Sequence, residues 1–228
     1  MKRLSLDILI STLRVLGHPV FERGDWNINT VGVRSRKNDE TGEECDDRFN
    51  DRVCVFYRVH GKWRFFTYAA ATVPGRQYLV NPMLPEYGAA ILVPGFYRGA
   101  YILGTHYGKP ALQQAGTMRL YRDATRDTVF DMDPRTIREA DWTGINIHYS
   151  ADNAPIVGPW SAGCQVLRYG PESARYREFI GHYERAIEAG WGNKFSYGLV
   201  REEGIPPVPP LIKGGIWRDA IGVFKCLI

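Results

Sequence analysis

Short runs of apolar residues, many of them alternating with polar ones, fill the middle of the chain and predict β-strands. Residues 53–59 and 62–71 are two such runs, and the His60-Gly61 pair between them predicts a tight hairpin turn. Proline and glycine separate the runs that follow. The other predicted strands are residues 77–80, 89–93, 96–103, 118–122, 145–147 and 195–200.

Two segments have the apolar spacing of an amphipathic helix. Residues 4–17 place leucines on one face and end at Gly17, a usual helix stop. Residues 171–189 begin at a proline, carry aromatic side chains at helical spacing and end before Gly190. Residues 20–51 are rich in Gly, Asn and Asp and predict loops.

These elements predict a mainly β fold, either a β-sandwich or a twisted antiparallel sheet, with a few peripheral helices and an α+β character overall. Residues 1–204 are predicted to form one domain with its β core over 53–168. Residues 205–228 then read as a Pro-rich linker and an apolar tail. The 13 tyrosines, 10 phenylalanines, 24 glycines and 14 prolines favour short strands joined by turns.

Charge and hydropathy narrow the classes of partner. A net charge of +4 over 228 residues is not the concentrated basic stripe of a nucleic-acid binder, so no nucleic-acid partner is expected. No apolar run approaches the ~20 residues that a membrane span requires. The first residues, Met-Lys-Arg, precede a stretch broken by polar residues with no small-residue cleavage site, so no clear signal peptide is identified and synthesis in the cytoplasm is expected.

The four cysteines, Cys45, Cys54, Cys164 and Cys226, are too few and too irregularly spaced for a disulfide scaffold. The acidic run around residues 43–51 offers oxygen ligands for a hard cation, but it lacks the spacing of a calcium loop and is interpreted as a solvated loop. No cofactor and no metal are therefore expected.

The most informative stretch runs from Gly144 to Val166. Residues 145–147 alternate as a strand does and deliver His148 at the strand end, and Ser161-Ala-Gly-Cys164 follows after a loop. A histidine beside a cysteine is the usual pair for thiol catalysis, in which the imidazole takes the thiol proton and stabilises the thiolate. Cys164 is thus the candidate nucleophile and His148 its base.

This stretch resembles the signature of the L,D-transpeptidase (YkuD-type) catalytic domain, a strand-end His followed by Ser-x-Gly-Cys. Ser161 lies 13 positions after His148, and the Ile-Val-Gly-Pro segment at 156–159 resembles the loop before that motif. Ala162 stands where the family usually has His. Val166 stands where it has Arg or Asn, with Arg168 displaced. Weaker likeness at residues 93–97 extends the resemblance over about 53–168.

The resemblance implies a cysteine enzyme that attacks a carbonyl in the peptide stems of bacterial peptidoglycan and forms an acyl-enzyme. Backbone N–H groups near Gly163 and Cys164 would hold the oxyanion, and Ser161 would orient the loop or the imidazole. The group that fixes the imidazole tautomer is left open among Asn146, Asp152 and a backbone carbonyl. The absence of an export signal favours a phage lysin or an antibacterial effector, made in the cytoplasm and acting at the periplasm or cell wall, that cuts more than it cross-links.

Three alternatives stay open: a transpeptidase that forms or exchanges cross-links, a non-catalytic wall-binding or virion module, and a metal hydrolase using His60, His106, His148 and the acidic loop. His106 and Tyr107, flanked by glycines after a strand, are candidates for substrate binding, with a surface turn as the alternative. The other substrate-binding candidates are Tyr149, Trp160, Ala162 and Arg168.

Overall fold

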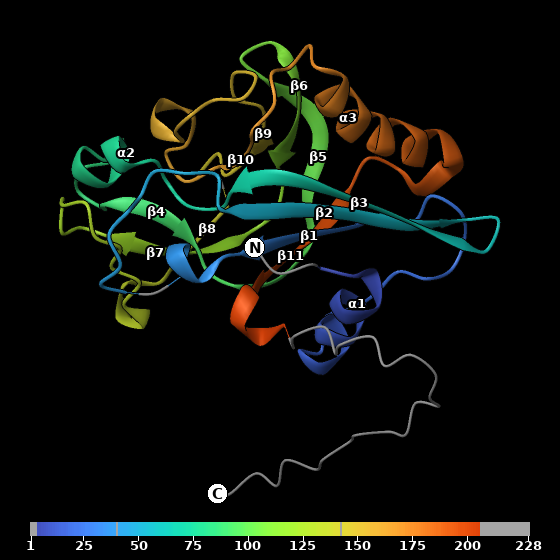
Figure 1. Cartoon of the computed structure of the whole chain (residues 1–228), viewed down its shortest axis with the longest axis horizontal. Helices are drawn as coiled ribbons and strands as arrows, with labels where there is room; N and C mark the ends of the chain where they lie inside the picture. The colour runs from blue at the N-terminus through green and yellow to red at the C-terminus, as the bar shows by residue number, and fades with distance from the viewer. Residues whose placement is uncertain (1–3, 40, 142, 206–228) are drawn as a thin grey trace, which may run out of the picture.

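The structure is a computed structural model that describes residues 4–39, 41–141 and 143–205. Within these ranges eight strands form a closed barrel in the order β1, β11, β5, β6, β9, β10, β3, β2 (Figure 1). The pairs β1–β11 and β9–β10 are parallel and the other neighbours are antiparallel. The barrel strands are β1 (Asn29–Arg34), β2 (Asp51–Val59), β3 (Lys62–Ala71), β5 (Gly95–His106), β6 (Lys109–Gln114), β9 (Ile147–His148), β10 (Gln165–Leu167) and β11 (Phe195–Arg201).

A second sheet lies at one end of the barrel, and helices α1 and α3 lie on opposite sides of the barrel (Figure 1). The sheet is antiparallel in the order β4 (Ala89–Leu92), β7 (Met118–Asp123), β8 (Arg138–Ala140). The helices are α1 (Leu6–Val15), α2 (Arg76–Val80) and α3 (Ala174–Ala186), the last continuing as a π-helical turn over Ile187–Trp191. Single 3-10 turns occupy Arg36–Asn38, Pro134–Thr136, Gly158–Trp160 and Glu202–Gly204.

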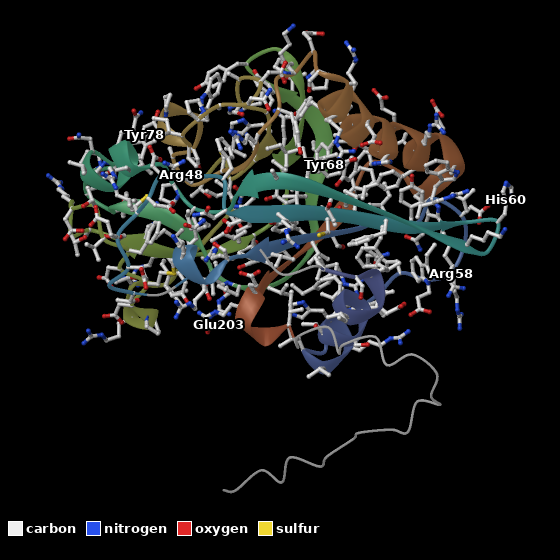
Figure 2. The ribbon with its side chains drawn as sticks, viewed as in Figure 1. Arg48, Arg58, His60, Tyr68, Tyr78 and Glu203 are labelled. Carbon is white, nitrogen blue, oxygen red and sulfur yellow. The ribbon has the colours of Figure 1, made fainter. Side chains whose placement is uncertain are left out.

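The long β2–β3 hairpin is apolar on both faces because each face meets a different partner. Successive side chains of a strand point to opposite faces. Val53, Val55 and Tyr57 join the large core cluster that also contains the aromatic residues of α3, whereas Cys54 and Phe56 pack with α1. The hairpin tip at His60 lies at the far end of the molecule from Tyr78 of α2 (Figure 2).

A buried arginine fixes the second sheet against the barrel. Arg34, at the end of β1, is fully buried, and its guanidinium donates to the carbonyls of Thr72 and Leu92 at 2.8 Å each. The Asp51 carboxylate accepts from the Thr72 backbone N–H and hydroxyl at 2.7 and 2.8 Å. These bonds join β1, the end of β3 and β4, and so set the position of β4 beside the pocket described below.

The expectation of a mainly β fold with few helices is confirmed. The sandwich form is not confirmed, since the main sheet closes as a barrel of mixed strand direction. Closure satisfies the backbone groups that edge strands of an open sheet would leave unpaired.

Several local expectations were wrong or incomplete. Residues 77–80 belong to helix α2, which follows the N-cap residue Gly75, rather than to a strand. Residues 20–51, expected to be loops, contain strand β1, and β6 also escaped prediction. The helix expected from residue 171 starts at Ala174, because the Ser173 side chain accepts the N–H of Tyr176 and caps the first turn.

The predicted linker and apolar tail after residue 205, including Cys226, lie outside the described residues. Among the helices that are described, none combines the length and apolar character needed to cross a bilayer.

Candidate functional site

Two adjacent parallel strands bring His148 and Cys164 to the same pocket. His148 is opposite Val166 in the β9–β10 register, and the N–H of Gln165 donates to the Asn146 carbonyl at 2.8 Å. Continuing this register places Cys164 diagonally across from His148 on one face of the sheet. Diagonal neighbours on adjacent strands have Cα atoms about 7–8 Å apart, which an imidazole and a thiol can bridge by side-chain rotation.

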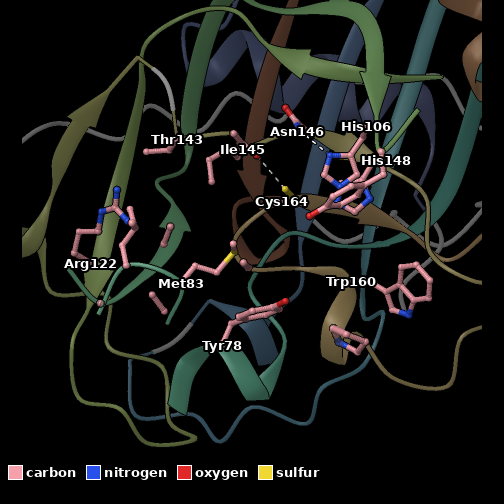
Figure 3. Close-up of a pocket in the computed structure, with 18 residues that line it drawn as sticks. Tyr78, Met83, His106, Arg122, Thr143, Ile145, Asn146, His148, Trp160 and Cys164 are labelled. Carbon is pink, nitrogen blue, oxygen red and sulfur yellow. Dashed lines mark hydrogen bonds between the residues drawn. The ribbon is translucent and has the colours of Figure 1, made fainter. Parts of the chain in front are cut away.

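The pocket has a volume of about 390 Å³ and opens between the barrel wall and the α2–β4 segment. Figure 3 shows the two imidazoles and Cys164 on one side of it, with Arg122 on the other side and Tyr78 and Met83 between. The lining residues are Tyr78, Met83, Leu84, Gly88, Ala89, Ala90, His106, Tyr107, Arg122, Thr143, Gly144, Ile145, Asn146, His148, Pro159, Trp160, Ala162 and Cys164.

His148 is held as a neutral base. The residue is 2 % exposed, and Nδ1–H donates to the Tyr149 carbonyl at 2.7 Å. This bond puts the proton on Nδ1 and leaves the lone pair on Nε2, which is buried without a partner. Burial, together with the neighbouring His106, lowers the pKa of His148 to about 3, against a smaller opposing effect of the Tyr149 carbonyl. The imidazole is therefore uncharged at neutral pH, with a free acceptor nitrogen.

His106, from the end of β5, stacks on His148. The ring centroids are 4.0 Å apart and the planes differ by 20°. The Asn146 side-chain oxygen accepts the Gln114 N–H at 2.9 Å, so the Asn146 amide nitrogen faces His106 Nδ1 at 3.2 Å and donates to it. The proton of His106 then lies on Nε2. Charge on one ring opposes charge on the other, so the stack favours two neutral rings.

Cys164 is a protonated thiol in this state. Its sulfur donates to the Gly144 carbonyl at 3.1 Å, and the side chain keeps some exposure to the pocket. Burial raises the pKa of the Cys164 thiol to about 11, with only a small opposing effect from the Asn146 backbone N–H. The expected stabilisation of a thiolate by His148 is therefore wrong for this state, because burial disfavours the charged form of both groups.

The turn before Cys164 is fixed by Ser161 and Gly163. Ser161 is fully buried, and its hydroxyl lies 3.0 Å from the Val73 carbonyl and 2.8 Å from the Cys164 carbonyl. Gly163 has a φ of +132°, and a Cβ there would lie 2.6 Å from the Ala90 carbonyl oxygen, so only glycine fits. The Gly163 N–H donates to Ser161 Oγ at 3.2 Å, so this expected oxyanion donor is engaged here.

The structure divides the other expected site residues. Tyr107, Trp160 and Ala162 line the pocket together with His106. Tyr149 does not line it, and its hydroxyl instead donates to the His106 carbonyl at 2.9 Å. Arg168 does not line it either, and its guanidinium donates to the Ala154 carbonyl at 2.9 Å.

The candidates for orienting His148 can now be separated. Asp152 accepts the Gly170 N–H at 2.8 Å, and the Asn146 side chain is bonded to His106. The Tyr149 carbonyl is the acceptor for His148 itself. A backbone carbonyl thus fixes the tautomer of the candidate base.

Several pocket residues escaped the sequence argument, and Tyr78, Met83 and Arg122 are three of them. They come from α2, the loop after it and β7, far along the chain from the Gly144–Val166 stretch. Arg122 is the one side chain with a full charge among the described residues that line the pocket. No local pattern marks it, because the fold alone brings β7 to this place.

The acidic loop does not form a metal centre in the described part of the chain. No group of three or more His, Cys, Asp or Glu side chains suited to a metal ion occurs there. Asp46 instead accepts from Asn50 at 2.8 and 2.9 Å, and Asp51 belongs to the Arg34 network. His60 is 90 % exposed at the hairpin tip, remote from the pocket (Figure 2).

Comparison of the chain with known protein families, curated proteins and solved structures gives no match. The transpeptidase resemblance therefore depends on the His148 and Ser161–Cys164 motif alone, and membership of that family stays a prediction.

Proposed function

We propose that the protein is a cysteine-dependent acyl-transfer enzyme that acts on the peptide stems of bacterial peptidoglycan. The observation that carries this proposal is the shared pocket of Cys164 and His148, in which a buried imidazole has its proton fixed on Nδ1 and its Nε2 free. A free imidazole nitrogen beside a thiol is the arrangement that nucleophilic catalysis requires. The substrate class comes from the resemblance of the motif.

The chemistry starts from two neutral groups. When a substrate carbonyl enters the pocket, the Cys164 thiol leaves the Gly144 carbonyl, its proton passes to His148 Nε2 and the sulfur forms a bond to the carbonyl carbon. The C–N bond of the amide then breaks, and the imidazolium gives its proton to the leaving amine. The His106 Nε2–H, on a ring that lines the same pocket, is a donor for the oxyanion or for a substrate carbonyl.

The acyl-enzyme is resolved by water or by an amine. We propose that water is the main acceptor and that the enzyme is a peptidase of the lysin or effector type. Ala162 at the pocket wall, in place of the usual histidine, leaves that part of the site open to solvent-sized acceptors. Transpeptidation by the same acyl-enzyme is the second candidate.

The test is incubation of the full chain with purified muropeptides, followed by mass spectrometry. Shortened stems indicate a peptidase, and new cross-links or exchanged terminal residues indicate a transpeptidase. Cys164→Ala, Cys164→Ser and His148→Ala should each remove turnover by several orders of magnitude, whereas the matched variant Cys45→Ala should keep it, because Cys45 is buried away from the pocket.

Full turnover in a folded Cys164→Ala variant would overturn the proposal. Loss of activity with chelator alone would favour the metal hydrolase. Absence of turnover in the wild type, with binding to intact wall retained, would favour the non-catalytic module.

A further inference from the structure

Arg122 projects into the pocket from β7 without an acidic partner. Its Nε is buried and has no hydrogen-bond partner, and no ion pair to a carboxylate is found among the described residues. Its guanidinium carbon lies 5.9 Å from the Tyr87 ring centroid, near the outer limit of a cation–π contact. Such a contact does not neutralise the charge. A half-buried cation is normally paired, and the described residues supply no carboxylate for this one.

The rest of the pocket lining offers Arg122 no charge of the opposite sign. It consists of apolar and neutral polar side chains, and both imidazoles are neutral because burial lowers their pKa values. An anionic ligand group entering the pocket would therefore have one charged partner, and a planar guanidinium best matches a planar carboxylate through two parallel hydrogen bonds.

Arg122 and the nucleophile are linked through one intervening strand. Arg122 is opposite Ala90 in the β4–β7 register, and the Ala90 carbonyl lies against Gly163, the residue before Cys164. Cross-strand and chain spacings then put the two Cα atoms on the order of 10 Å apart. An extended dipeptide covers about 7 Å, so one ligand can reach both ends of the pocket.

We propose that Arg122 anchors a free carboxylate of the acyl donor, and that this carboxylate holds the scissile carbonyl beside Cys164. The proposal rests on the proposed function and narrows its substrate to a stem peptide with a free carboxylate about one to two residues from the bond attacked. Amidation turns that carboxylate into an uncharged group of nearly equal size and should therefore remove the interaction with Arg122.

The test measures binding separately from turnover. Full-length Cys164→Ala protein is titrated by calorimetry with the tetrapeptide L-Ala-γ-D-Glu-meso-diaminopimelate-D-Ala and with versions in which each free carboxylate is amidated in turn. We expect one amidation to weaken binding roughly 10- to 100-fold, the range lost with a charge-assisted hydrogen bond. Adding Arg122→Gln should weaken the parent peptide to the same level and abolish the effect of that amidation.

Matched variants guard against a general loss of structure. Arg119→Gln changes an exposed arginine of the same strand outside the pocket lining and should leave all affinities unchanged. Arg122→Lys keeps the charge but not the planar pair of N–H donors, so it should retain part of the preference for the free carboxylate over the amide. Thermal unfolding should be preserved in Arg122→Gln, since its side chain makes no hydrogen bond within the described structure.

Equal weakening of every peptide by Arg122→Gln, or no weakening of any, would overturn the anchor. The two proposals fail separately. Arg122-dependent binding without turnover by the wild type would leave the anchor standing and remove the acyl-transfer function. Turnover that is unaffected by Arg122→Gln and by amidation would remove the anchor and leave the acyl-transfer function standing.

Discussion

The alkylation rate of Cys164 as a function of pH tests the neutral-pair description directly. The pKa of this thiol is about 11, against 9.0 for an ordinary cysteine. At pH 7 the two-unit difference lowers the thiolate population about 100-fold. A more basic thiolate is also more nucleophilic, and a Brønsted coefficient of ~0.4–0.5 returns about 6- to 10-fold of this loss. Cys164 should therefore react with iodoacetamide on the order of 10-fold more slowly than a free cysteine peptide.

The shape of the profile is the sharper criterion. The rate should rise about tenfold for each pH unit from 6.5 to 9.5, with no plateau, because the thiol pKa lies above that window. Peptide mapping by mass spectrometry follows Cys164 separately from Cys45 and Cys54, which are buried and should stay unmodified in the folded protein. His148→Gln should leave this profile unchanged while it removes the proposed turnover, since the imidazole carries no charge in the free protein.

A plateau of fast alkylation that begins below pH 7 would refute this reasoning. Such a plateau would mean that the free protein holds a thiolate beside an imidazolium, with the proton already transferred. Loss of the plateau in His148→Gln would then identify the imidazolium as its cause.

Two further predictions concern stability. Gly163→Ala should lower the melting temperature and remove activity, because its methyl group would meet the Ala90 carbonyl at 2.6 Å. The matched variant Gly181→Ala, in helix α3 with open space around it, should be neutral or stabilise by up to about 1 kcal/mol. Equal effects of the two variants in calorimetry would contradict this. The folded pKa of His148 is about 3 and its unfolded value is 6.5, so the unfolded chain binds more protons below pH 6.5 and stability falls with acid. Between pH 7.5 and pH 5 this group lowers the free energy of unfolding by about 2 kcal/mol. His148→Gln should remove that loss when urea unfolding is compared at the two pH values.

Sequence patterns predicted the elements whose buried side chains are apolar. The β2–β3 hairpin was predictable because both faces are apolar and the His60-Gly61 turn takes positive φ values of 51° and 72°. Strand β1 was not, because its polar residues are buried through specific partners. Thr30 bonds the Tyr183 hydroxyl at 2.8 Å, and Arg34 enters the network with Thr72. Polarity in the sequence thus concealed a core strand.

The same division applies to the candidate site. Cys164 and His148 were recognisable because one continuous stretch supplies both and the turn between them needs Ser161 and Gly163. Arg122 carried no such signal, since its place depends on how β7 pairs with β4 and how β4 meets the barrel. The protonation of the site was also beyond the sequence, because desolvation depends on the folded surroundings of each group.

Closure of the barrel through the parallel β1–β11 pair has a consequence for biosynthesis. Strand β1 ends at Arg34 and β11 begins at Phe195, so a ribosome adds about 160 residues between them. At ~5–20 residues per second this takes on the order of 10–30 s. Throughout that interval the β1 edge that later receives β11 has no partner, and the wall that carries His148 and Cys164, once it is made, belongs to an open sheet. The nascent chain therefore gains the finished candidate pocket only after nearly all of residues 1–201 have been made.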